Sequence, residues 1–310
     1  MQVHTDISSL PSFKNAVITV GTFDGVHKGH QHLIHRIKSL ASAIDGESVL
    51  ITFDPHPRAI VFPDDQSLRI LSIPEEKIEL LHQLSVDHLV VAPFTKAFSQ
   101  LPARDYVERF LVGNFHPAII AIGYNHQFGH HRDGNIELLR KLSSTYHFKV
   151  EEITKQLVDD IEVSSTRIRI ALQEGDVKTA RHLLGHYYSL QGPVVQGNQL
   201  GRKLGYPTAN IAVEDSFKLI PADGVYVIQA RLNQELLHGV ASIGFRPTVN
   251  GTYRTVEAFL FDYDTTLYGE ILKIEFMEWL RPEVKFETVD LMIAAIDNDV
   301  KQARAILAKK

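Results

Sequence analysis

Two histidines, His27 and His30, stand three residues apart with Gly29 between them, directly after a glycine-rich turn. At this spacing on a helical turn, both imidazole rings lie on one face. Gly29 has no side chain, so a phosphate can approach the backbone closely. Imidazole N–H groups can stabilise charge on a phosphorus centre, and no Cys or Ser lies between the two histidines. The residues favour phosphate chemistry without a covalent intermediate.

A strand and a helix must position this pair. Residues 16–20 (AVITV) are a mostly β-branched apolar run, typical of a strand buried on both faces. Residues 21–25 (GTFDG) then turn the chain sharply, and apolar residues at helical spacing follow. The first turn of a helix attracts anions. Two histidines on a surface helix are common in a chain with 16 histidines, but the strand and turn favour a functional pair.

The run GTFDGVHKGH at 21–30 resembles the HxGH signature of the nucleotidylyltransferase superfamily. Its GxFDGVHxGH form is similar to that of the bacterial bifunctional riboflavin kinase/FMN adenylyltransferases, or FAD synthetases. The resemblance implies that His27 and His30 are catalytic. It also implies that the phosphates of ATP are bound by Gly21, Thr22, Phe23, Asp24 and Gly29.

The composition limits the classes of protein to which this chain can belong. A length of 310 residues favours two domains. The absence of cysteine excludes disulfides, thiolate catalysis and Cys-based zinc sites. A net charge of −5 without a basic tract argues against nucleic-acid binding. No apolar run approaches the ~20 residues of a membrane span, and the polar N-terminus is no signal peptide. We expect a cytoplasmic protein, monomeric or a weak homo-oligomer.

The first half alternates between strand and helix patterns. Strands are expected at 16–20, 47–53, 88–92, 118–122 and 148–153. Helices are expected after the first strand and at 74–84, 103–112 and 136–142. This alternation predicts an α/β, Rossmann-like domain with a parallel sheet and with ligands at the carboxyl ends of the strands.

Three loops fall at those ends, at 21–30, 53–58 and 123–134, which predicts one site. Two prolines make 54–58 an expected extended turn. In the resembled family the second and third loops hold the flavin, which implies flavin contacts for Pro55, Asn125 and Phe128.

The third loop departs from the family pattern. Asn125 stands where Asp is frequent, and Gln127 stands where Arg is frequent. Asn keeps hydrogen bonding but loses the charge, so an impaired adenylyltransferase stays an open alternative. The nearby His126, His130 and His131 are read as surface-loop residues, because no carboxylate pattern for a metal site accompanies them.

Residues 163–169 (VSSTRIR) are a second candidate element. Serines at a helix start can simply cap its free N–H groups, whereas arginines with hydroxyls can clamp a triphosphate. The segment resembles the family's ISSTxIR motif. This implies that Ser165 and Thr166 bind ATP phosphates and that Arg169 is catalytic.

Past residue 183 the pattern changes, so we expect domains at 1–183 and 184–310. Short β-rich runs lie at 187–195, 224–230, 237–243, 257–261 and 271–276. They favour an antiparallel sheet or small barrel, and an amphipathic helix is expected at 289–307. The resemblance implies a six-stranded antiparallel β-barrel riboflavin kinase domain with this terminal helix.

The stretch 197–210 (GNQLGRKLGYPTAN) has three glycines and two cations, a loop able to fold over phosphates. It lacks the GxxxxGK[ST] pattern, and a plain hairpin connection is the alternative. It resembles the GRxLGxPTAN signature of riboflavin kinases. ATP-phosphate contacts are thereby implied for Gly201, Arg202, Lys203 and Gly205. Thr208 and Asn210 are implied as ligands of Mg²⁺, and their oxygens suit a hard cation.

Two later runs extend the resemblance. Residues 239–248 (GVASIGFRPT) are similar to GVANIGxRPT, with Ser242 in place of Asn, and residues 280–286 (LRPEVKF) are similar to LRxExKF. Arg281 is thereby implied in flavin binding. Glu257 is by default a solvent-facing strand residue. The resemblance implies that it is the general base for a primary hydroxyl attacking a γ-phosphate.

The sequence therefore predicts a two-domain enzyme. The C-terminal domain is expected to convert riboflavin and ATP to FMN and ADP. The N-terminal domain is expected to convert FMN and ATP to FAD and pyrophosphate. Mg²⁺ is expected in both reactions, to bridge phosphate oxygens. Two alternatives stay open: a riboflavin kinase with an impaired adenylyltransferase domain, and a non-catalytic flavin-sensing protein.

Overall fold

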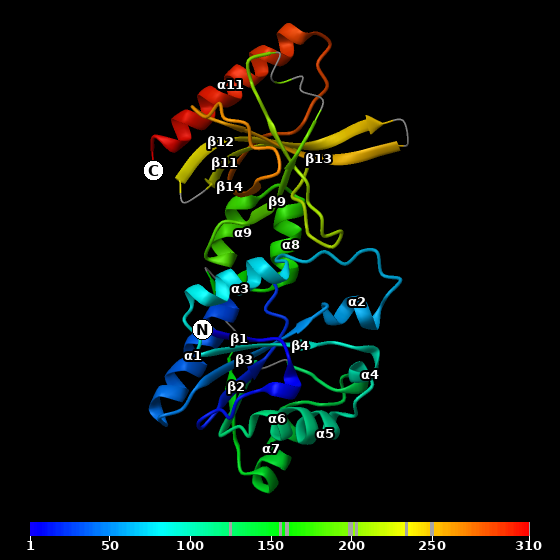
Figure 1. Ribbon diagram of the computed structural model, residues 1–310, viewed down its shortest axis with the longest axis vertical. Coiled ribbons are helices and arrows are strands. Elements are labelled where there is room, and N and C mark those ends of the chain that lie inside the picture. The colour runs from blue at the N-terminus through cyan, green and yellow to red at the C-terminus, as the bar shows by residue number, and fades with distance from the viewer. Residues whose placement is uncertain are drawn as a thin grey trace. The chain divides into compact units, whose positions relative to one another are not determined.

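The computed structural model describes residues 1–123, 126–154, 157–158, 161–197, 201, 204–232, 235–248 and 251–309. The chain forms two compact units, Met1–Ser165 and Thr166–Lys310 (Figure 1). The domain boundary expected near residue 183 stays a prediction.

A six-stranded sheet, in which every neighbouring pair is parallel, forms the centre of the first unit, in the order β1-β4-β3-β2-β5-β6. Its strands are β1 (Gln2–His4), β2 (Val17–Val20), β3 (Ser48–Asp54), β4 (His88–Pro93), β5 (Ile119–Gly123) and β6 (Lys149–Ile153). A two-stranded ribbon of β7 (Leu157–Val158) and β8 (Ile161–Glu162) follows. The parallel sheet expected from the alternation is confirmed. β1 was not expected, because its three residues are mostly polar and exposed.

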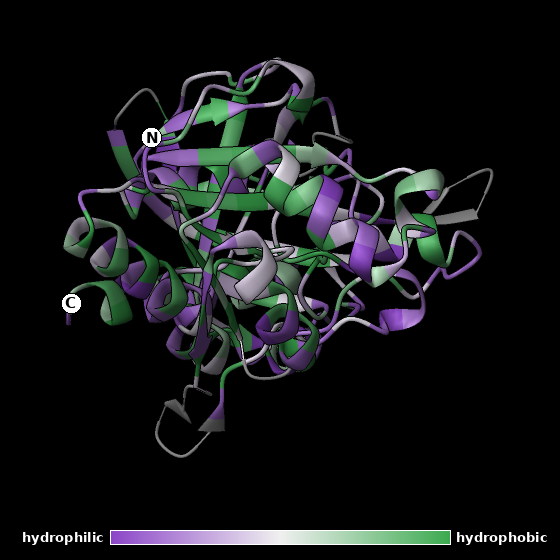
Figure 2. Ribbon diagram, turned by 90° about the horizontal axis from the view of Figure 1, so that it is seen from below, coloured by the Kyte–Doolittle hydropathy of each residue, from purple (hydrophilic) through white to green (hydrophobic). Residues whose placement is uncertain are grey.

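Helices cover both faces of this sheet. They are α1 (Lys28–Ala43), α2 (Pro57–Val61), α3 (Pro74–Gln83), α4 (Lys96–Ser99), α5 (Ala103–Asp105), α6 (Gly113–Phe115) and α7 (Ile136–Tyr146). Ile37 of α1 and Leu81 of α3 pack with Val17 in one core. Leu139 of α7 packs with Ile18 in another. Adjacent residues of β2 thus point into opposite cores, as in a strand buried on both faces. The strands of the sheet carry buried hydrophobic residues, and green, hydrophobic stretches within strands are visible in the ribbon of Figure 2.

The range 103–112 is helical as expected, but the helix is not α-helical throughout: α5 is followed by a π-helical segment, Tyr106–Val112, and then by α6. The wider i→i+5 turns of a π-helix let Tyr106, Phe110 and Leu111 enter the same core. The extended turn expected at 54–58 was wrong from Pro57 onward, because a helix begins there. Pro57 opens α2, because proline is favoured in the first helical turn.

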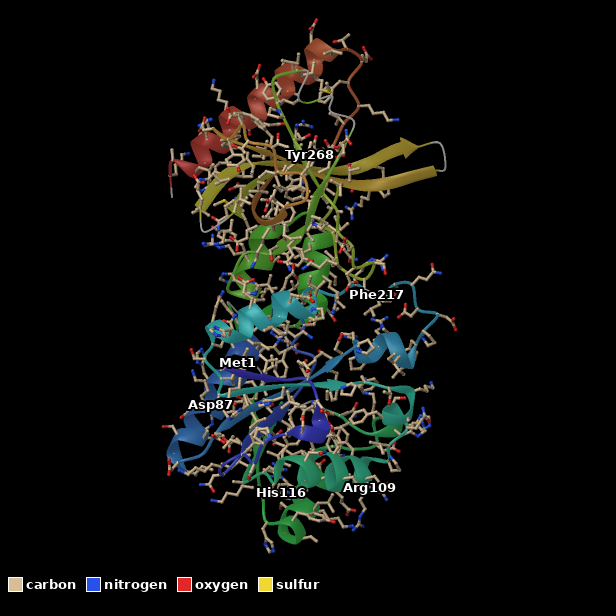
Figure 3. All side chains as sticks on the ribbon, in the orientation of Figure 1. Met1, Asp87, Arg109, His116, Phe217 and Tyr268 are labelled. Atoms are coloured by element: carbon tan, nitrogen blue, oxygen red, sulfur yellow. The ribbon has the colours of Figure 1, made fainter. Side chains whose placement is uncertain are left out.

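The three loops expected at one site follow β2, β3 and β5, which are neighbours in the sheet. From β2 the chain moves to β3 and β4 on one side and then to β5 and β6 on the other. The topological switch point therefore lies between β2 and β5, where ligands of open α/β sheets bind. The start of β3 is fixed by Asp87, labelled in Figure 3, which accepts hydrogen bonds from the backbone N–H and hydroxyl of Ser48.

A closed barrel forms the second unit, in the order β10-β13-β12-β11-β14-β9, and all its pairs are antiparallel. Its strands are β9 (Ser189–Val195), β10 (Ala209–Ile211), β11 (Gly224–Leu232), β12 (Glu235–Thr248), β13 (Gly251–Leu260) and β14 (Ile271–Arg281). The six-stranded antiparallel barrel is confirmed. Its β10 was not among the expected runs, because only three residues pair within a loop-like sequence.

Among the described residues of the second unit, the helices beside the barrel are α8 (Ser165–Gln173), α9 (Val177–Leu184) and α11 (Val289–Leu307). Asp176 caps α9, and Gly185 ends it at a φ of 82°. α11 covers the 289–307 range expected for the terminal helix, and its Val300 and Ala303 pack in a cluster with Val225, Val227 and Val240 of the barrel.

Candidate functional site

His27 is the N-cap of α1. Its Nδ1 accepts a hydrogen bond from the backbone N–H of His30 at 3.3 Å, and its side chain is only 7% exposed. Because Nδ1 acts as an acceptor, the proton of the neutral ring lies on Nε2. The cap therefore fixes the tautomer and leaves His27 with an Nε2–H donor at the N-terminus of a helix.

The rings of His27 and His30 are stacked, with centroids 3.6 Å apart and planes at 14°. The expectation that both lie on one face is confirmed. Phe23 meets the His30 ring edge-on at 5.1 Å. Burial, followed by electrostatic interactions with His27 and Lys77, holds the pKa of His30 well below its usual range. Its buried Nδ1 has no hydrogen-bond partner within the described part of the chain. A neutral His30 at pH 7 follows.

Gly29 makes room for this stack. A Cβ at this position would lie 3.2 Å from both Cε1 and Nδ1 of His27. The absence of a side chain therefore lets the His27 ring fold back across the first turn of α1.

The glycine loop is held from two sides. The carboxylate of Asp24, 2% exposed, accepts the backbone N–H groups of Leu71 at 2.8 Å and Ser72 at 3.1 Å. Ser72 Oγ in return accepts the N–H of Gly25 at 3.0 Å. These bonds join the loop to the segment that leads into α3. Asp24 thus has a structural task, and its phosphate contact stays a prediction.

The other loop residues expected at ATP are tied to the sheet or the core. Gly21 donates its N–H to the Ile51 carbonyl of β3 at 3.0 Å. The carbonyl of Thr22 accepts from Thr52 Oγ1 at 3.2 Å. Phe23 is 1% exposed. These contacts fix the loop, and the binding roles of its residues stay predictions.

Ser165 joins this site. Its Oγ donates to the carbonyl of Asp24 at 3.1 Å, across 141 residues of sequence. Ser165 and the glycine loop are therefore in contact, as a shared role requires. Thr166 and Arg169 lie on α8 within the second unit, and their phosphate contacts stay predictions.

The loops expected to hold flavin are partly described. Pro55 directly follows β3. Phe128 is 7% exposed and stacks on Tyr106 with centroids 5.2 Å apart. Asn125 lies outside the described residues. Burial, and to a lesser extent the charge of Arg132, lowers the pKa of His126 to about 4. His126 is half-buried, where an exposed loop residue was expected. Its lowered pKa keeps the ring neutral at pH 7.

A cavity of about 210 Å³ opens in the second unit. Its apolar wall is formed by Val225, Val240, Phe259, Phe286, Met292 and Ile296. Its polar side chains include Thr208, Glu257 and Arg281. An apolar cavity with a few convergent polar groups is typical of a site for a small planar ligand.

Four residues that the sequence marked separately come together around Glu257. Thr208 Oγ1 donates to Glu257 Oε2 at 3.3 Å. Asn210 on β10 is the register partner of Glu257 on β13, and Ser242 on β12 faces Glu257 from the other side. Antiparallel pairing, not sequence proximity, assembles this group.

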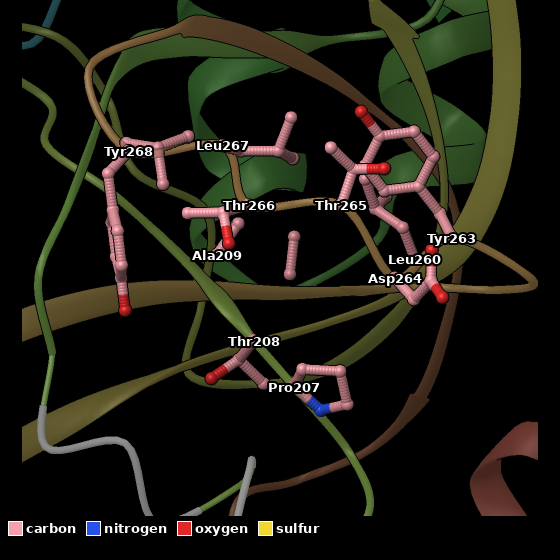
Figure 4. Close-up of a pocket in the computed structure, with 12 residues that line it drawn as sticks. Pro207, Thr208, Ala209, Leu260, Tyr263, Asp264, Thr265, Thr266, Leu267 and Tyr268 are labelled. Atoms are coloured by element: carbon pink, nitrogen blue, oxygen red, sulfur yellow. The ribbon is translucent and has the colours of Figure 1, made fainter.

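A second cavity of about 50 Å³ adjoins the first, and Thr208 lines both. Figure 4 shows Thr208 and Pro207 across this cavity from Thr265 and Thr266. The remaining wall is formed largely by the 263–268 segment, which ends at Tyr268. Sequence reasoning missed this segment. Its hydroxyl-rich composition directly after the Glu257 strand was the available signal.

Arg281 is held by an acid on the terminal helix. Its guanidinium donates to Asp299 at 3.0 Å from Nε and 2.8 Å from Nη2, and it lies 5.6 Å from the Phe286 ring. Asp299 is 2% exposed. Tyr206 donates its hydroxyl to Asp297 on the same helix. Sequence reasoning missed both acids, because the pattern of α11 was read only for its apolar stripe.

The glycine-rich stretch before Thr208 is partly described. Gly201 lines the larger cavity, and Gly205 has a φ of +87°, a conformation that glycine adopts readily. Asn210 packs on Gly197, where a Cβ would lie 2.4 Å from Nδ2. Arg202 and Lys203 lie outside the described residues.

Within the described residues, each helix is too short or too polar to span a bilayer. A family model described as FAD synthetase matches residues 10–167, and one described as riboflavin kinase matches residues 184–307.

Curated relatives match nearly end to end. The bifunctional riboflavin kinase/FMN adenylyltransferase of Haemophilus influenzae is 35% identical over 293 residues, covering 94% of each chain. The protein of the same name from Listeria monocytogenes is 36% identical, over 95% of this chain and 93% of its own. That from Escherichia coli K12 is 31% identical, over 96% and 95%.

A solved structure supports the same fold. A protein from Streptococcus pneumoniae, named as a macrolide-efflux protein, is 29% identical with a TM-score of 0.88 and covers 97% of this chain and 98% of its own. Two family models in tandem, near-full-length relatives of one name and the two sites described above agree. The chain belongs to the family of bifunctional riboflavin kinase/FMN adenylyltransferases.

Proposed function

We propose that the chain makes FAD from riboflavin in two steps at two separate sites. The barrel phosphorylates riboflavin with ATP, giving FMN and ADP. The parallel-sheet unit transfers AMP from ATP to FMN, giving FAD and pyrophosphate. The observation that carries the proposal is the presence of both kinds of site in one chain: stacked imidazoles at a helix N-terminus, and a carboxylate beside a hydroxyl in an apolar cavity.

In the adenylyl transfer, a phosphate oxygen of FMN attacks the α-phosphorus of ATP. The bond from that phosphorus to the bridging oxygen breaks, and pyrophosphate leaves. The FMN phosphate is already an anion at neutral pH, so no general base is required and positioning with charge neutralisation suffices. We assign donation to the α-phosphate to His27 and His30. We assign the β- and γ-phosphates to Ser165, Thr166 and Arg169.

In the kinase reaction, the primary hydroxyl of riboflavin must lose a proton as its oxygen attacks the γ-phosphorus. Glu257 accepts this proton as general base, and ADP leaves. Thr208, which donates to Glu257 at 3.3 Å, orients the carboxylate. The flavin ring occupies the apolar cavity beside Arg281 and Phe286. Because Thr208 also lines the second cavity, ATP approaches Glu257 from the 263–268 side.

Magnesium fits this donor set. Thr208 and Asn210 offer neutral oxygens and Glu257 offers a carboxylate, which are the ligand types that a hard cation prefers. The hydroxyl and the carboxylate are already in contact, and Asn210 is the register partner of Glu257. When bound, Mg²⁺ would neutralise phosphate charge. Thr208 and Asn210 would hold it there.

The proposal includes the expected boundary near residue 183, since the riboflavin kinase match begins at residue 184. It also includes a monomer or weak homo-oligomer with no nucleic-acid partner, supported by the net charge of −5. We place the enzyme in the cytoplasm, where its substrate ATP is abundant.

A chromatographic time course of riboflavin with ATP and Mg²⁺ tests the proposal. We expect FMN to appear first and to decline as FAD rises. If FMN accumulates without FAD, the first unit is impaired and the departures at Asn125 and Gln127 are its first suspects. If riboflavin binds but yields neither product nor ADP, the chain is a flavin sensor and the proposal is wrong.

A further inference from the structure

Lys77, in the first turn of α3, carries a charge that the protein does not neutralise by contact. It is 9% exposed, and its ammonium makes no hydrogen bond or ion pair with any residue that the structure describes. Burying an unpaired ammonium is costly, and most lysines are exposed. The Lys77 Nζ is not among the fully buried atoms that lack a partner, so the ammonium is open to solvent and to an anion that arrives from outside the chain.

The surrounding bonds place Lys77 beside the adenylyl-transfer loop. The Asp24 carboxylate holds the backbone N–H groups of Leu71 and Ser72. Glu76 then accepts the N–H of Ile73 at 3.1 Å, which caps the start of α3. The first turn of α3 is therefore fixed next to the glycine loop, with little freedom to move away.

Electrostatic coupling gives the same location. The positive charge of Lys77 contributes to the lowered pKa of His30. Burial lowers the pKa of Lys77 itself, while Asp24 and Asp54 oppose this effect. The ammonium thus interacts electrostatically with Asp54 at the end of β3, with Asp24 of the glycine loop and with His30. This is the edge of the sheet where the site lies.

A structural role as counter-charge for Asp24 explains less. Asp24 Oδ1 already accepts two backbone N–H groups, and no ion pair joins it to Lys77. A lysine serving only Asp24 would gain most from direct contact with its carboxylate. The ammonium instead stays available beside a stack of neutral imidazoles that can donate hydrogen bonds but carry no charge.

We propose that Lys77 binds a phosphate oxygen of the substrate in the adenylyl-transfer site and supplies the positive charge that the His27–His30 pair lacks. The inference rests on the function proposed for the 21–30 loop. The ligand chemistry is a phosphate anion, and its source is either the triphosphate of ATP or the monophosphate of FMN.

Lys77→Met removes the charge while keeping an unbranched chain. A charge-assisted hydrogen bond to phosphate accounts for roughly a 10- to 100-fold effect. We therefore expect kcat/KM for FAD formation from FMN to fall about 10- to 100-fold, and Lys77→Arg to recover most of it. A rise in KM for ATP alone identifies the triphosphate as the partner, and a rise in KM for FMN alone identifies the flavin phosphate.

The full chain carries its own folding control, since riboflavin kinase activity is measured on the same sample and is expected to be unchanged. The matched control is Lys141→Met, at an exposed lysine of α7, which is expected to alter neither activity. If Lys77→Met also lowers kinase activity, Lys77→Gln, which keeps a polar tip, is judged by the same criteria.

A parallel His27→Ala variant separates the two possible failures. If it loses FAD formation while Lys77→Met stays within about threefold of the parent, the inference about Lys77 is overturned and the proposed site stands. If both variants retain FAD formation, the proposed site is itself wrong. A Lys77→Arg variant as inactive as Lys77→Met would also overturn the inference, because the charge would then not be what matters.

Discussion

The two candidate sites are built from opposite kinds of side chain. In the parallel-sheet unit, two imidazoles stack beside a glycine at a helix start, and no carboxylate lies in contact with the ring pair among the bonds described. In the barrel, a carboxylate lies 3.3 Å from a hydroxyl. The difference follows from the nucleophile. A phosphate monoester is ionised at pH 7, whereas an alcohol must be deprotonated as it reacts.

The two sites also differ in how they are held. Loops after neighbouring parallel strands build the first, fixed by caps such as the bond from His30 N–H to His27 Nδ1. Residues within strands build the second, since Asn210 and Glu257 are register partners in a closed barrel. The chemistry of the first site therefore depends on helix starts, and that of the second on strand register.

The largest separation of the two activities is expected from Glu257→Gln. This change keeps the shape of the side chain but removes the base, which typically contributes 10²–10⁴-fold. We expect kcat for FMN formation to fall about 10³-fold, while FAD formation from supplied FMN stays unchanged. Separate assays of the two half-reactions on one preparation measure this. Equal loss of both activities would indicate a folding defect or a shared site.

The reverse separation is expected from the double change His27→Ala with His30→Ala. Loss of hydrogen-bond donors to a developing phosphate charge costs about 10²–10³-fold each in comparable sites. FAD formation is expected to fall at least 10²-fold, with riboflavin kinase activity retained. FAD formation within about tenfold of the parent would show that the imidazoles are not the donors.

Much of both sites could be predicted because the chemistry is carried by short contiguous motifs. The strand, glycine loop and helix start around His27 follow from local pattern, and so do the alternation of the first half and the β-rich second half. β1 and β10 were missed because three-residue strands carry too little pattern. Their pairing is decided by distant neighbours such as His88 and Ala258.

Residues that act across sequence distance were missed for a related reason. Asp299 reads as one acid in an amphipathic helix, and only the fold shows it buried against Arg281. In the sequence Lys77 is an ordinary helix lysine. Only the structure shows that its side chain is largely buried and makes no hydrogen bond or ion pair with a described residue. Asp24 was assigned by motif to phosphate, yet its described bonds run to backbone N–H groups 47 and 48 residues away. Local sequence does not encode such partners.

Acid should lower the stability of the first unit through His126. The pKa of His126 is about 4 in the folded chain against an ordinary 6.5. Between pH 6.5 and pH 4 the unfolded chain therefore binds a proton that the folded chain does not, and stability falls as pH falls. This residue alone accounts for about 3 kcal/mol of unfolding free energy lost by pH 4. His126→Asn should flatten the dependence.

Two probes report on the units separately in urea titrations across this pH range. The single tryptophan, Trp279, lies on β14 of the second unit, and FAD formation reports on the first. We expect the pH dependence to be steeper for loss of FAD formation than for Trp279 fluorescence. An unchanged pH slope in His126→Asn would exclude this histidine as the source.

The smallest effect is expected from Tyr206→Phe, which tests how the cavity proposed for the flavin is closed. The Tyr206 hydroxyl donates to Asp297 of α11, and its ring meets Phe259 edge-on at 5.5 Å. Phenylalanine keeps the ring contact but frees the segment before Thr208 from the terminal helix. Since one hydrogen bond contributes about 0.5–1.5 kcal/mol, KM for riboflavin should rise about two- to tenfold with kcat nearly unchanged.

Asp297→Asn is the matched variant, because an amide oxygen still accepts the Tyr206 hydroxyl and should raise KM less than Tyr206→Phe does. FAD formation from FMN should be unaffected by either change. If Tyr206→Phe instead lowers kcat tenfold at constant KM, the tyrosine acts at the transferring phosphate. The barrel would then place a side chain from a loop beside Glu257, and its site would depend on more than strand register.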